Sequence, residues 1–267
     1  MNRTVAIMGC GWLGLPLAKA LLKDGFMVRG TTTSESKLEM LQNEGIVPFL
    51  ISLSEEKIDG DISSFLINTE VLVINVPPKL RNGNKGNYVK KIQLLLESVK
   101  VAKTKKVIFV SSTSVYGNIE GEVTEETIPQ PITESGKQLL AAENLFADTP
   151  ELRTTIIRFG GLIGPDRHPV AMLSGRKGLT NGNTVINLIH LEDCIGIIRA
   201  TIGNEWWGEL FNGVYPFHPS KKEYYTNEAL KRGLVIPQYS SSGIPSGKKI
   251  ESRRLIHVKK YRFNTPF

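Results

Sequence analysis

Three glycines near the N-terminus have the spacing of a phosphate-binding turn. Gly9, Gly11 and Gly14 form the pattern G-x-G-x-x-G directly after an apolar run, and a helical pattern follows them. In such a turn the glycines allow a tight bend, a close approach of the backbone to a pyrophosphate and close helix packing, while the helix N-terminus attracts the anion. The pattern therefore predicts a dinucleotide site that includes Trp12 and Leu13, rather than a purely structural glycine-rich turn.

The polar residues after the second apolar run bear on the choice of dinucleotide. A site selective for NAD usually has a carboxylate about 20 residues after the glycine turn, where it holds the ribose 2′-hydroxyl. Here Thr31, Thr32 and Thr33 occupy that region, its first carboxylate is Glu35, and Lys37 follows closely. Because hydroxyls and a cation suit a 2′-phosphate, we expect NADP in preference to NAD. The alternative is that these residues only cap the next helix.

Four later segments, taken in order with the glycine turn, carry a family resemblance. They read VIFVSSTSVYG at 107–117, RFGGLIGP at 158–165, NLIHLED at 187–193 and KKIESRRL at 248–255. Together they resemble the extended short-chain dehydrogenase/reductases, the NAD-dependent epimerase/dehydratase superfamily, over nearly the whole chain. The resemblance implies a Rossmann-type α/β fold that binds NAD or NADP.

The resemblance also implies roles for residues at the strand ends. Ser112 and its neighbour Thr113 would orient the substrate oxygen, although Ser and Thr at a strand end often only satisfy local backbone groups. The residues after the fourth and sixth strands would line the cofactor. With the glycine turn and the threonines, the cofactor-binding candidates are Gly9, Gly11, Trp12, Leu13, Gly14, Thr31, Thr32, Thr33, Lys37, Asn75, Val76, Pro77, Ser111, Phe159, Gly160 and Gly161.

One helix departs from the family pattern. Family members carry Tyr-x-x-x-Lys on one helical face, where the ammonium lowers the pKa of the phenol so that it can exchange a proton as hydride moves. Aligning SGKQLLAAE with the family's YGxSKxxAE puts Ser135 in the Tyr position and Leu139 in the Lys position. Lys137 lies on a different side of the helix and cannot replace the missing lysine. The proton must then come from Tyr116, from His168 or from a water held by Ser135.

The candidate substrate contacts are Tyr116, Arg167, His168 and His190. The resemblance favours packing under the loop over a catalytic role for Tyr116. For His190 it favours a structural role at a strand-helix junction over substrate binding. Arg167, Lys177 and the basic C-terminal segment could attract an anionic substrate.

Two functions remain open at this point. The first is an NAD(P)-dependent oxidoreductase or epimerase for a small hydroxy or carbonyl compound, sugar-derived compounds included, with Ser112, Thr113 and Ser135 as catalytic candidates. The second is a non-catalytic NAD(P)-binding sensor, which needs the glycine turn but no acid. The turn GCGWLGLPLA also resembles that of β-hydroxyacid dehydrogenases, but the late strands do not supply their long all-helical C-terminal domain. Neither the substrate nor the reaction direction follows from the sequence.

The elements that must position these residues alternate between short apolar runs and helical patterns. This alternation predicts a doubly wound α/β fold with parallel strands and crossover helices. Several runs are apolar throughout, as in strands buried on both faces. We expect strands at 4–9, 26–31, 47–52, 70–76, 106–112, 153–159, 184–190 and 208–214, helices at 13–23, 36–43, 88–102, 134–146, 191–202 and 221–232, and irregular loops at 79–87, 160–169 and 239–247.

The regular alternation weakens after the sixth strand, which suggests two units. We expect a Rossmann domain at 1–165 and a small C-terminal substrate subdomain at 166–267, with 186–202 returning to the Rossmann domain. Ligands of open α/β sheets bind at the carboxyl ends of the strands, so the late segments would cap that edge.

The composition is that of an ordinary globular protein. The 267 residues carry a formal charge of +7, part of it in the C-terminal segment, but no nucleic-acid-binding motif accompanies it. Cys10 and Cys194 are too few for a disulfide framework and lack metal-ligand spacing, so we expect reduced thiols and no metal. Without a membrane-length apolar stretch or a signal region, we expect a cytoplasmic protein, either monomeric or a homodimer paired through the helix at 134–146.

Overall fold

The computed structural model describes residues 3–78, 80, 86–240 and 247–267. Most of the loop predicted at 79–87, and residues 241–246 of the loop predicted at 239–247, lie outside the described residues.

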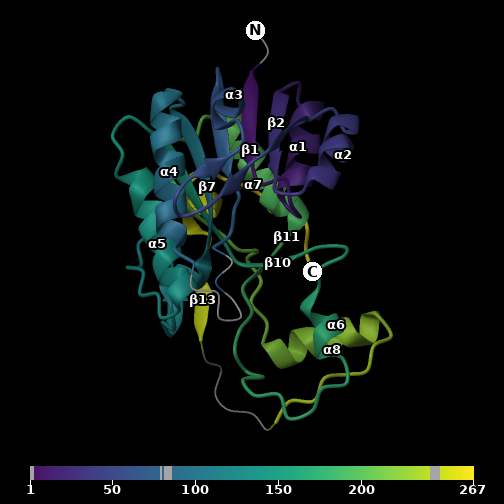
Figure 1. Ribbon diagram of the computed structural model, residues 1–267. Coiled ribbons are helices and arrows are strands. Elements are labelled where there is room, and N and C mark those ends of the chain that lie inside the picture. The colour runs from purple at the N-terminus through teal and green to yellow at the C-terminus, as the bar shows by residue number, and fades with distance from the viewer. Residues whose placement is uncertain (1–2, 79, 81–85, 241–246) are drawn as a thin grey trace.

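A seven-stranded parallel sheet forms the centre of the molecule (Figure 1). Its order is β12-β9-β7-β6-β1-β2-β3, so the direction of winding reverses between β1 and β6, which is the switch point where open α/β sheets bind ligands. The predicted Rossmann-type fold is thus confirmed. The strands are β1 (Thr4–Met8), β2 (Met27–Thr32), β3 (Val47–Leu50), β6 (Val71–Ile74), β7 (Lys106–Ser112), β9 (Arg153–Phe159) and β12 (Leu210–Gly213).

Helices cover both faces of this sheet (Figure 1). Every residue of β1 and of β6 is buried, as the apolar runs predicted, because both strands contact helices on either side. One face carries α1 (Gly14–Lys23), α2 (Leu38–Asn43) and α7 (Leu191–Gly203), and the other carries α3 (Ile62–Leu66), α4 (Tyr88–Val101) and α5 (Glu134–Ala147).

Three two-stranded sheets lie outside the central one. The hairpin β4 (Ser52–Leu53) and β5 (Ile58–Asp59) is antiparallel. The pairs β10 (Gly161–Ile163) with β11 (Leu188–His190), and β8 (Gly121–Val123) with β13 (Lys248–Ile250), are parallel. The prediction of an irregular loop across 160–169 was therefore wrong at its start, because β10 finds its partner in a segment far along the chain, which local pattern does not reveal.

The C-terminal subdomain is built around α6 (Pro169–Leu173) and α8 (Lys221–Lys231), which lie below the sheet in Figure 1. Its apolar cluster includes Val170, Tyr224 and Tyr225. Besides the predicted 186–202, two later elements also contact the central sheet or its core. Strand β12 forms the edge of the main sheet, and the π-helical turn η3 (Arg254–Val258) places Leu255 in the core of the α1 and α7 face.

The C-terminal segment is held to α7 by a buried carboxylate. Asp193 is 1% exposed and accepts hydrogen bonds from the backbone amides of Asn264 at 2.8 Å and Thr265 at 3.1 Å. The Asp of the NLIHLED segment therefore has a structural role that joins α7 to the chain end.

Candidate functional site

The glycine-rich turn leads from β1 into α1 at the switch point of the sheet. Gly9 has a φ of +105°, and a Cβ there would lie 2.7 Å from the carbonyl oxygen of Asn75. A Cβ on Gly14 would lie 2.1 Å from the carbonyl oxygen of Gly9, whereas Gly11 has no neighbour within 4 Å of a Cβ. Two glycines therefore allow close packing and the third leaves open space over the turn, which is the division of roles that a pyrophosphate site requires. The turn fits the phosphates of a dinucleotide.

Side chains from the ends of β2 and β6, the two strands that flank β1, hold this turn. The hydroxyl of Thr31 accepts a hydrogen bond from the Gly9 amide at 2.8 Å, and the side-chain amide of Asn75 donates to the Gly9 carbonyl at 3.1 Å. Thr31 is only 2% exposed, and Leu13 is 3% exposed. The side chain of Thr31 thus supports the turn and that of Leu13 packs in the apolar core. This corrects the expectation of a side-chain contact with cofactor and leaves their backbone groups for such a contact.

The remaining residues at the end of β2 lie nearer to the surface. Thr32 is mostly buried and its hydroxyl accepts the Ser34 amide at 3.1 Å, while Thr33 and Lys37 are exposed. Ser34 precedes the 3₁₀ turn η1 (Glu35–Lys37) but makes no side-chain capping bond to it. Thr33 and Lys37 therefore remain accessible on this edge, and the capping alternative has no support from Ser34.

Trp12 joins the glycine turn to the loop after β10. Its indole N–H donates to a carboxylate oxygen of Asp166 at 2.9 Å, and the guanidinium of Arg167 lies 5.0 Å from the centre of its ring. A Cβ on Gly164 would lie 2.7 Å from the same indole. The loop that leads into the subdomain is therefore fastened directly to the cofactor turn, and Arg167 lies over that turn.

A buried ionic network lies beneath the loop that follows β7. Arg158 donates to Glu143 at 2.6 Å, and their side chains are 5% and 1% exposed. Ser111 donates its hydroxyl to Glu143, and Arg158 also donates to the Tyr116 hydroxyl at 3.0 Å. Tyr116 in turn donates to Asn212 at 2.8 Å. The network ties α5 to three strands, β7, β9 and β12.

This network excludes two candidates from direct contact with a ligand. Tyr116 is 0% exposed, and burial raises the pKa of its phenol. We therefore correct its candidate roles in substrate binding and proton transfer, because both bonding directions of its hydroxyl are taken inside the core. Ser111 is 6% exposed and its hydroxyl serves Glu143, so its expected contact with cofactor is corrected for the same reason.

The helix α5 begins against the same loop. Thr133 caps it by accepting the Gly136 amide at 3.1 Å, and a Cβ on Gly136 would lie 3.2 Å from the carbonyl oxygen of Ser114. Ser135 is half-buried in this first turn, whereas Leu139 is 5% exposed within the apolar cluster of the α4 and α5 face. Ser135, predicted at the family's tyrosine position, thus lies half-buried in the turn of α5 that approaches the loop, and Leu139, predicted at the lysine position, is part of the core.

The two histidine candidates lie in capping positions. His168 is 5% exposed in its side chain, with Nδ1 accepting the Val170 amide at 3.2 Å and Nε2 lying 2.9 Å from the Tyr224 hydroxyl. Burial lowers the pKa of His168. His190 accepts the Glu192 amide at the start of α7. His168 therefore belongs to the core of the subdomain, which corrects its candidacy as proton donor and substrate contact.

The residues after β6 and β9 divide in the same way. The backbone carbonyl of Val76 accepts a hydrogen bond from the Tyr88 hydroxyl at 2.8 Å, and the next residue, Pro77, is exposed. Phe159 is 2% exposed and packs so closely that a Cβ on Gly213 would lie 2.4 Å from its ring. The side chain of Phe159 is therefore a core element, while Gly160 and Gly161 lie on the accessible side of the strand end.

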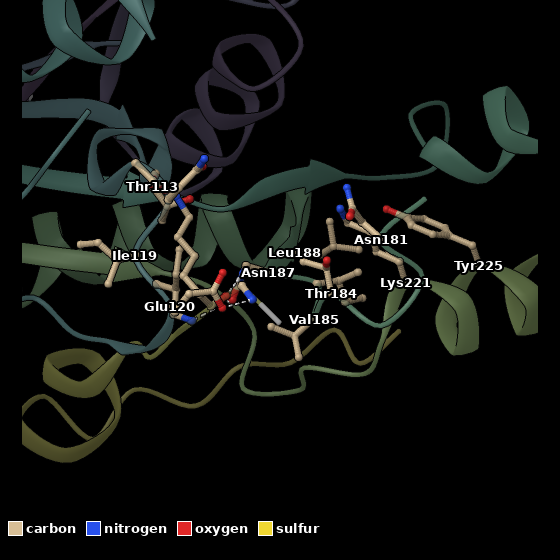
Figure 2. A pocket seen from close by; sticks show the side chains of 16 residues that line it. Thr113, Ile119, Glu120, Asn181, Thr184, Val185, Asn187, Leu188, Lys221 and Tyr225 are labelled. Carbon is tan, nitrogen blue, oxygen red and sulfur yellow. Dashed lines mark hydrogen bonds between the residues drawn. The ribbon is translucent and has the colours of Figure 1, made fainter. Parts of the chain in front are cut away.

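A cavity of about 570 Å³ is lined by Thr113, the residue that follows Ser112 in the chain. Figure 2 shows Thr113 and Glu120 on one side of it and Asn181, Lys221 and Tyr225 on the other. The lining combines the loop after β7, the segment before β11, the start of α8 and strand β13. Its volume is within the range of about 300–1,000 Å³ that small-molecule sites occupy.

Ser112 is the last residue of β7 and directly precedes the cavity-lining Thr113. Its hydroxyl oxygen accepts the Ser114 amide at 3.2 Å, and the side chain is half-buried. Thr113 is 7% exposed and lines the cavity. One further residue of the lining, Lys248, donates from Nζ to the carbonyl oxygens of Thr113 at 3.1 Å and Gly117 at 2.7 Å. Sequence reasoning missed Lys248, since only the positive charge of the C-terminal segment pointed to it.

Both cysteines are buried free thiols, and burial raises the pKa of Cys10 to about 12. Within residues 3–78, 80, 86–240 and 247–267, no group of three or more His, Cys, Asp or Glu side chains could hold a metal ion. In the same part of the chain, no helix is both long enough and apolar enough to cross a membrane.

Comparison with known proteins agrees with the turn and the fold. A family model described as NAD(P)H-binding matches residues 9–189. Protein YeeZ of Escherichia coli (strain K12) is 34% identical over 266 residues, which cover 99% of this chain and 97% of YeeZ. A Bacillus subtilis (strain 168) protein, "Uncharacterized UDP-glucose epimerase YtcB", is 25% identical over 224 residues, which cover 72% of this chain and 70% of that protein.

Solved structures show the same fold. The UDP-glucuronic acid 4-epimerase of Bacillus cereus, in complex with UDP-glucuronic acid and NAD, has a TM-score of 0.80 and 22% identity, with 99% of this chain and 95% of that chain covered. The family match includes the glycine turn, the loop after β7 and the approach to α7. The chain therefore belongs to the NAD(P)H-binding family and has the Rossmann-type fold of the NAD-dependent epimerases and dehydratases.

Proposed function

We propose that this protein is an NAD(P)-dependent oxidoreductase or epimerase that acts on a small hydroxy or carbonyl compound. The observation that carries the proposal is the cavity lined by Thr113, the residue that follows Ser112 at the carboxyl end of β7, on the same sheet edge as the glycine turn. A protein that only senses a dinucleotide has no need of this second site. The relative described as a UDP-glucose epimerase makes a sugar-derived substrate the first class to examine.

In this proposal each residue has a limited task. The bound nicotinamide cofactor would take up or deliver a hydride. Ser112 would donate a hydrogen bond to the substrate oxygen, because its hydroxyl oxygen already accepts the Ser114 amide and this bond orients the group. Thr113 would shape the cavity next to it. A positioned hydrogen-bond donor of this kind contributes about 10²- to 10³-fold in rate.

The proton would reach the substrate oxygen by way of a water held at Ser135. Of the three candidate sources, Tyr116 is enclosed in the core and His168 in the subdomain. Ser135 is half-buried in the turn of α5 that packs on the loop after Ser112. A serine hydroxyl can accept one hydrogen bond and donate another at the same time, so Ser135 can hold a water that passes a proton to the substrate oxygen.

Arg167 belongs with the cofactor in this proposal. It was expected among the substrate contacts, but its guanidinium lies over Trp12 in the glycine turn. The open space at Gly11 leaves room for a pyrophosphate, and a planar guanidinium suits phosphate oxygens.

The test of the function uses loading followed by turnover. Purified protein should bind NADPH or NADH by fluorescence, and the loaded protein should change cofactor absorbance, or interconvert substrate, with some member of a panel of aldehydes, ketones, sugar acids and nucleotide sugars. Ser112→Ala should lower turnover by about 10²-fold with the cofactor Kd unchanged. Binding without turnover over the whole panel, or a Ser112→Ala effect confined to cofactor affinity, would contradict the proposal.

The cofactor preference has a separate test. We propose NADP over NAD because Thr33 and Lys37 are exposed at the end of β2, where no carboxylate of that strand competes for the ribose. Lys37→Ala should weaken NADPH binding by about tenfold, the loss of one charge-assisted hydrogen bond, and leave the NADH Kd unchanged. A tighter Kd for NADH than for NADPH in the unmodified protein would refute the preference.

A further inference from the structure

Lys248 is the cationic group of the cavity that the structure holds most firmly. Its ammonium donates to the carbonyl oxygens of Thr113 and Gly117, which leaves the third of its three protons for another acceptor. Its own backbone is fixed as well, since Asn187 donates to the Lys248 carbonyl at 2.8 Å and β13 pairs with β8. The position of this charge beside Thr113 is therefore built into the fold.

The ammonium of Lys248 has no counter-ion in the described parts of the chain. No carboxylate there lies within 4.0 Å of it, or of the Lys221 ammonium across the cavity. Lys248 is partly buried, and this burial lowers its pKa. Removing a cation from water without a compensating anion is unfavourable, so its retention at a cavity wall points to a ligand that brings negative charge.

The neighbouring lysine on the same strand shows the contrast. Lys249 is exposed and pairs with Glu251 at 2.6 Å, which raises its pKa. Successive side chains of a strand point to opposite faces, so one lysine is directed to the cavity and the next to solvent. The cavity also contains a carboxylate, Glu120, which accepts the Gly247 amide. The two lysines that line the cavity, Lys221 and Lys248, outnumber this one carboxylate, so the cavity has an excess of positive charge.

We propose that Lys248, with Lys221 on the opposite wall, binds an anionic oxygen group of the substrate, so that the substrate is a hydroxy or carbonyl compound carrying a carboxylate or a phosphate. This assignment rests on the proposed function, because only that function makes the bound anionic group part of a substrate. The binding of an anion at Lys248 does not depend on turnover. The competing view is that Lys248 only staples the loop between Thr113 and Gly117, a role that needs its hydrogen bonds but not its charge.

The experiment reads the lysine itself. Protein labelled with ¹³C-lysine and saturated with NADPH is titrated with inorganic phosphate and, separately, with acetate, against sodium chloride at matched ionic strength. We expect a saturable shift of the Lys248 Cε signal with at least one of the two anions and an upward shift of the Lys248 pKa on saturation, since a bound anion favours the charged form. The anion with the lower Kd identifies the group. Lys249 should respond to neither beyond the chloride control.

Variants separate the charge from the staple. Lys248→Gln keeps hydrogen-bond donors for the two carbonyls but removes the charge. It should raise the Kd of the preferred anion, measured by thermal shift, by about tenfold or more. Lys248→Arg should stay within about threefold of the original Kd, and Lys249→Gln should leave it unchanged. An unchanged Kd in Lys248→Gln, or no saturable response to either anion, would overturn the inference. The anion titration can also be run without cofactor. A failure to bind NADPH would therefore contradict the proposed function, while the anion titration would still test the role of Lys248.

Discussion

The glycine turn and the cavity wall lie at the same edge of one sheet but are assembled in different ways. The turn is made of neighbours in sequence, Gly9 to Gly14, supported by Thr31 and Asn75 at the ends of adjoining strands. The cavity wall combines Thr113 with Lys248, which are 135 positions apart. The first region has little freedom to change without steric conflict. The second depends on charges and hydrogen bonds between distant segments, so it can change its ligand without changing the fold.

The largest expected effect concerns the buried network beneath the loop after β7, on the cavity side of the comparison. Glu143→Ala should lower the free energy of unfolding by about 3–5 kcal/mol, because it leaves the buried Arg158 without its partner. Chemical denaturation measures the loss. The matched control is Glu134→Ala on the same helix, an exposed residue whose side chain accepts a hydrogen bond from Gln138, and its effect should stay within about 0.5 kcal/mol. Equal effects of the two changes would show that the network is not what holds α5.

A second pair of changes separates packing from ligand contact inside the turn. Gly14→Ala should cost about 1–3 kcal/mol of stability, since its Cβ would meet the Gly9 carbonyl. Gly11→Ala should leave stability within about 0.5 kcal/mol, because nothing surrounds its Cβ, but should weaken cofactor binding. Thermal unfolding and NADPH titration of both variants provide the measurements. Stability loss in Gly11→Ala with intact binding would reverse the roles given to the two glycines.

The smallest effect probes the distant contacts of the cavity side. Glu125 is 4% exposed, accepts the backbone amides of Asn212 and Arg254, and has one carboxylate oxygen without a hydrogen-bond partner in the described chain. Burial raises its pKa. Its contribution to stability is therefore complete below the ordinary pKa of about 4.3 and is lost as pH rises through the raised value.

Replacing this carboxylate should show the pH dependence directly. Glu125→Gln keeps an oxygen for the two amides and removes the charge, so it should be more stable than the original protein by about 1 kcal/mol at neutral pH. The difference should shrink as the pH falls toward 4, and thermal unfolding across this range measures it. A difference that grows toward low pH would mean that the carboxylate is not protonated more readily in the fold.

The sequence predicted the parts of the site that arise from local pattern. The parallel sheet, the main helices and the glycine turn follow from apolar periodicity and from residues adjacent in the chain, and the structure contains them. The same reasoning named Ser111 as a cofactor contact and His168 as a possible proton donor, and kept Tyr116 as a substrate candidate although it favoured packing under the loop for that residue. Their burial depends on Arg158, Glu143, Asn212 and Tyr224, and no local pattern indicates those contacts.

The sequence alone thus determined that this protein has a dinucleotide-binding α/β fold, while the loss of the Tyr and Lys pair from α5 stays a prediction from the family resemblance. Only the tertiary structure decided which polar groups reach the cavity. The reason is physical: backbone periodicity and turn geometry act over a few residues, whereas burial and charge pairing depend on segments that meet only after folding. Lys248 is the clearest case, since its place beside Thr113 follows from the pairing of β13 with β8.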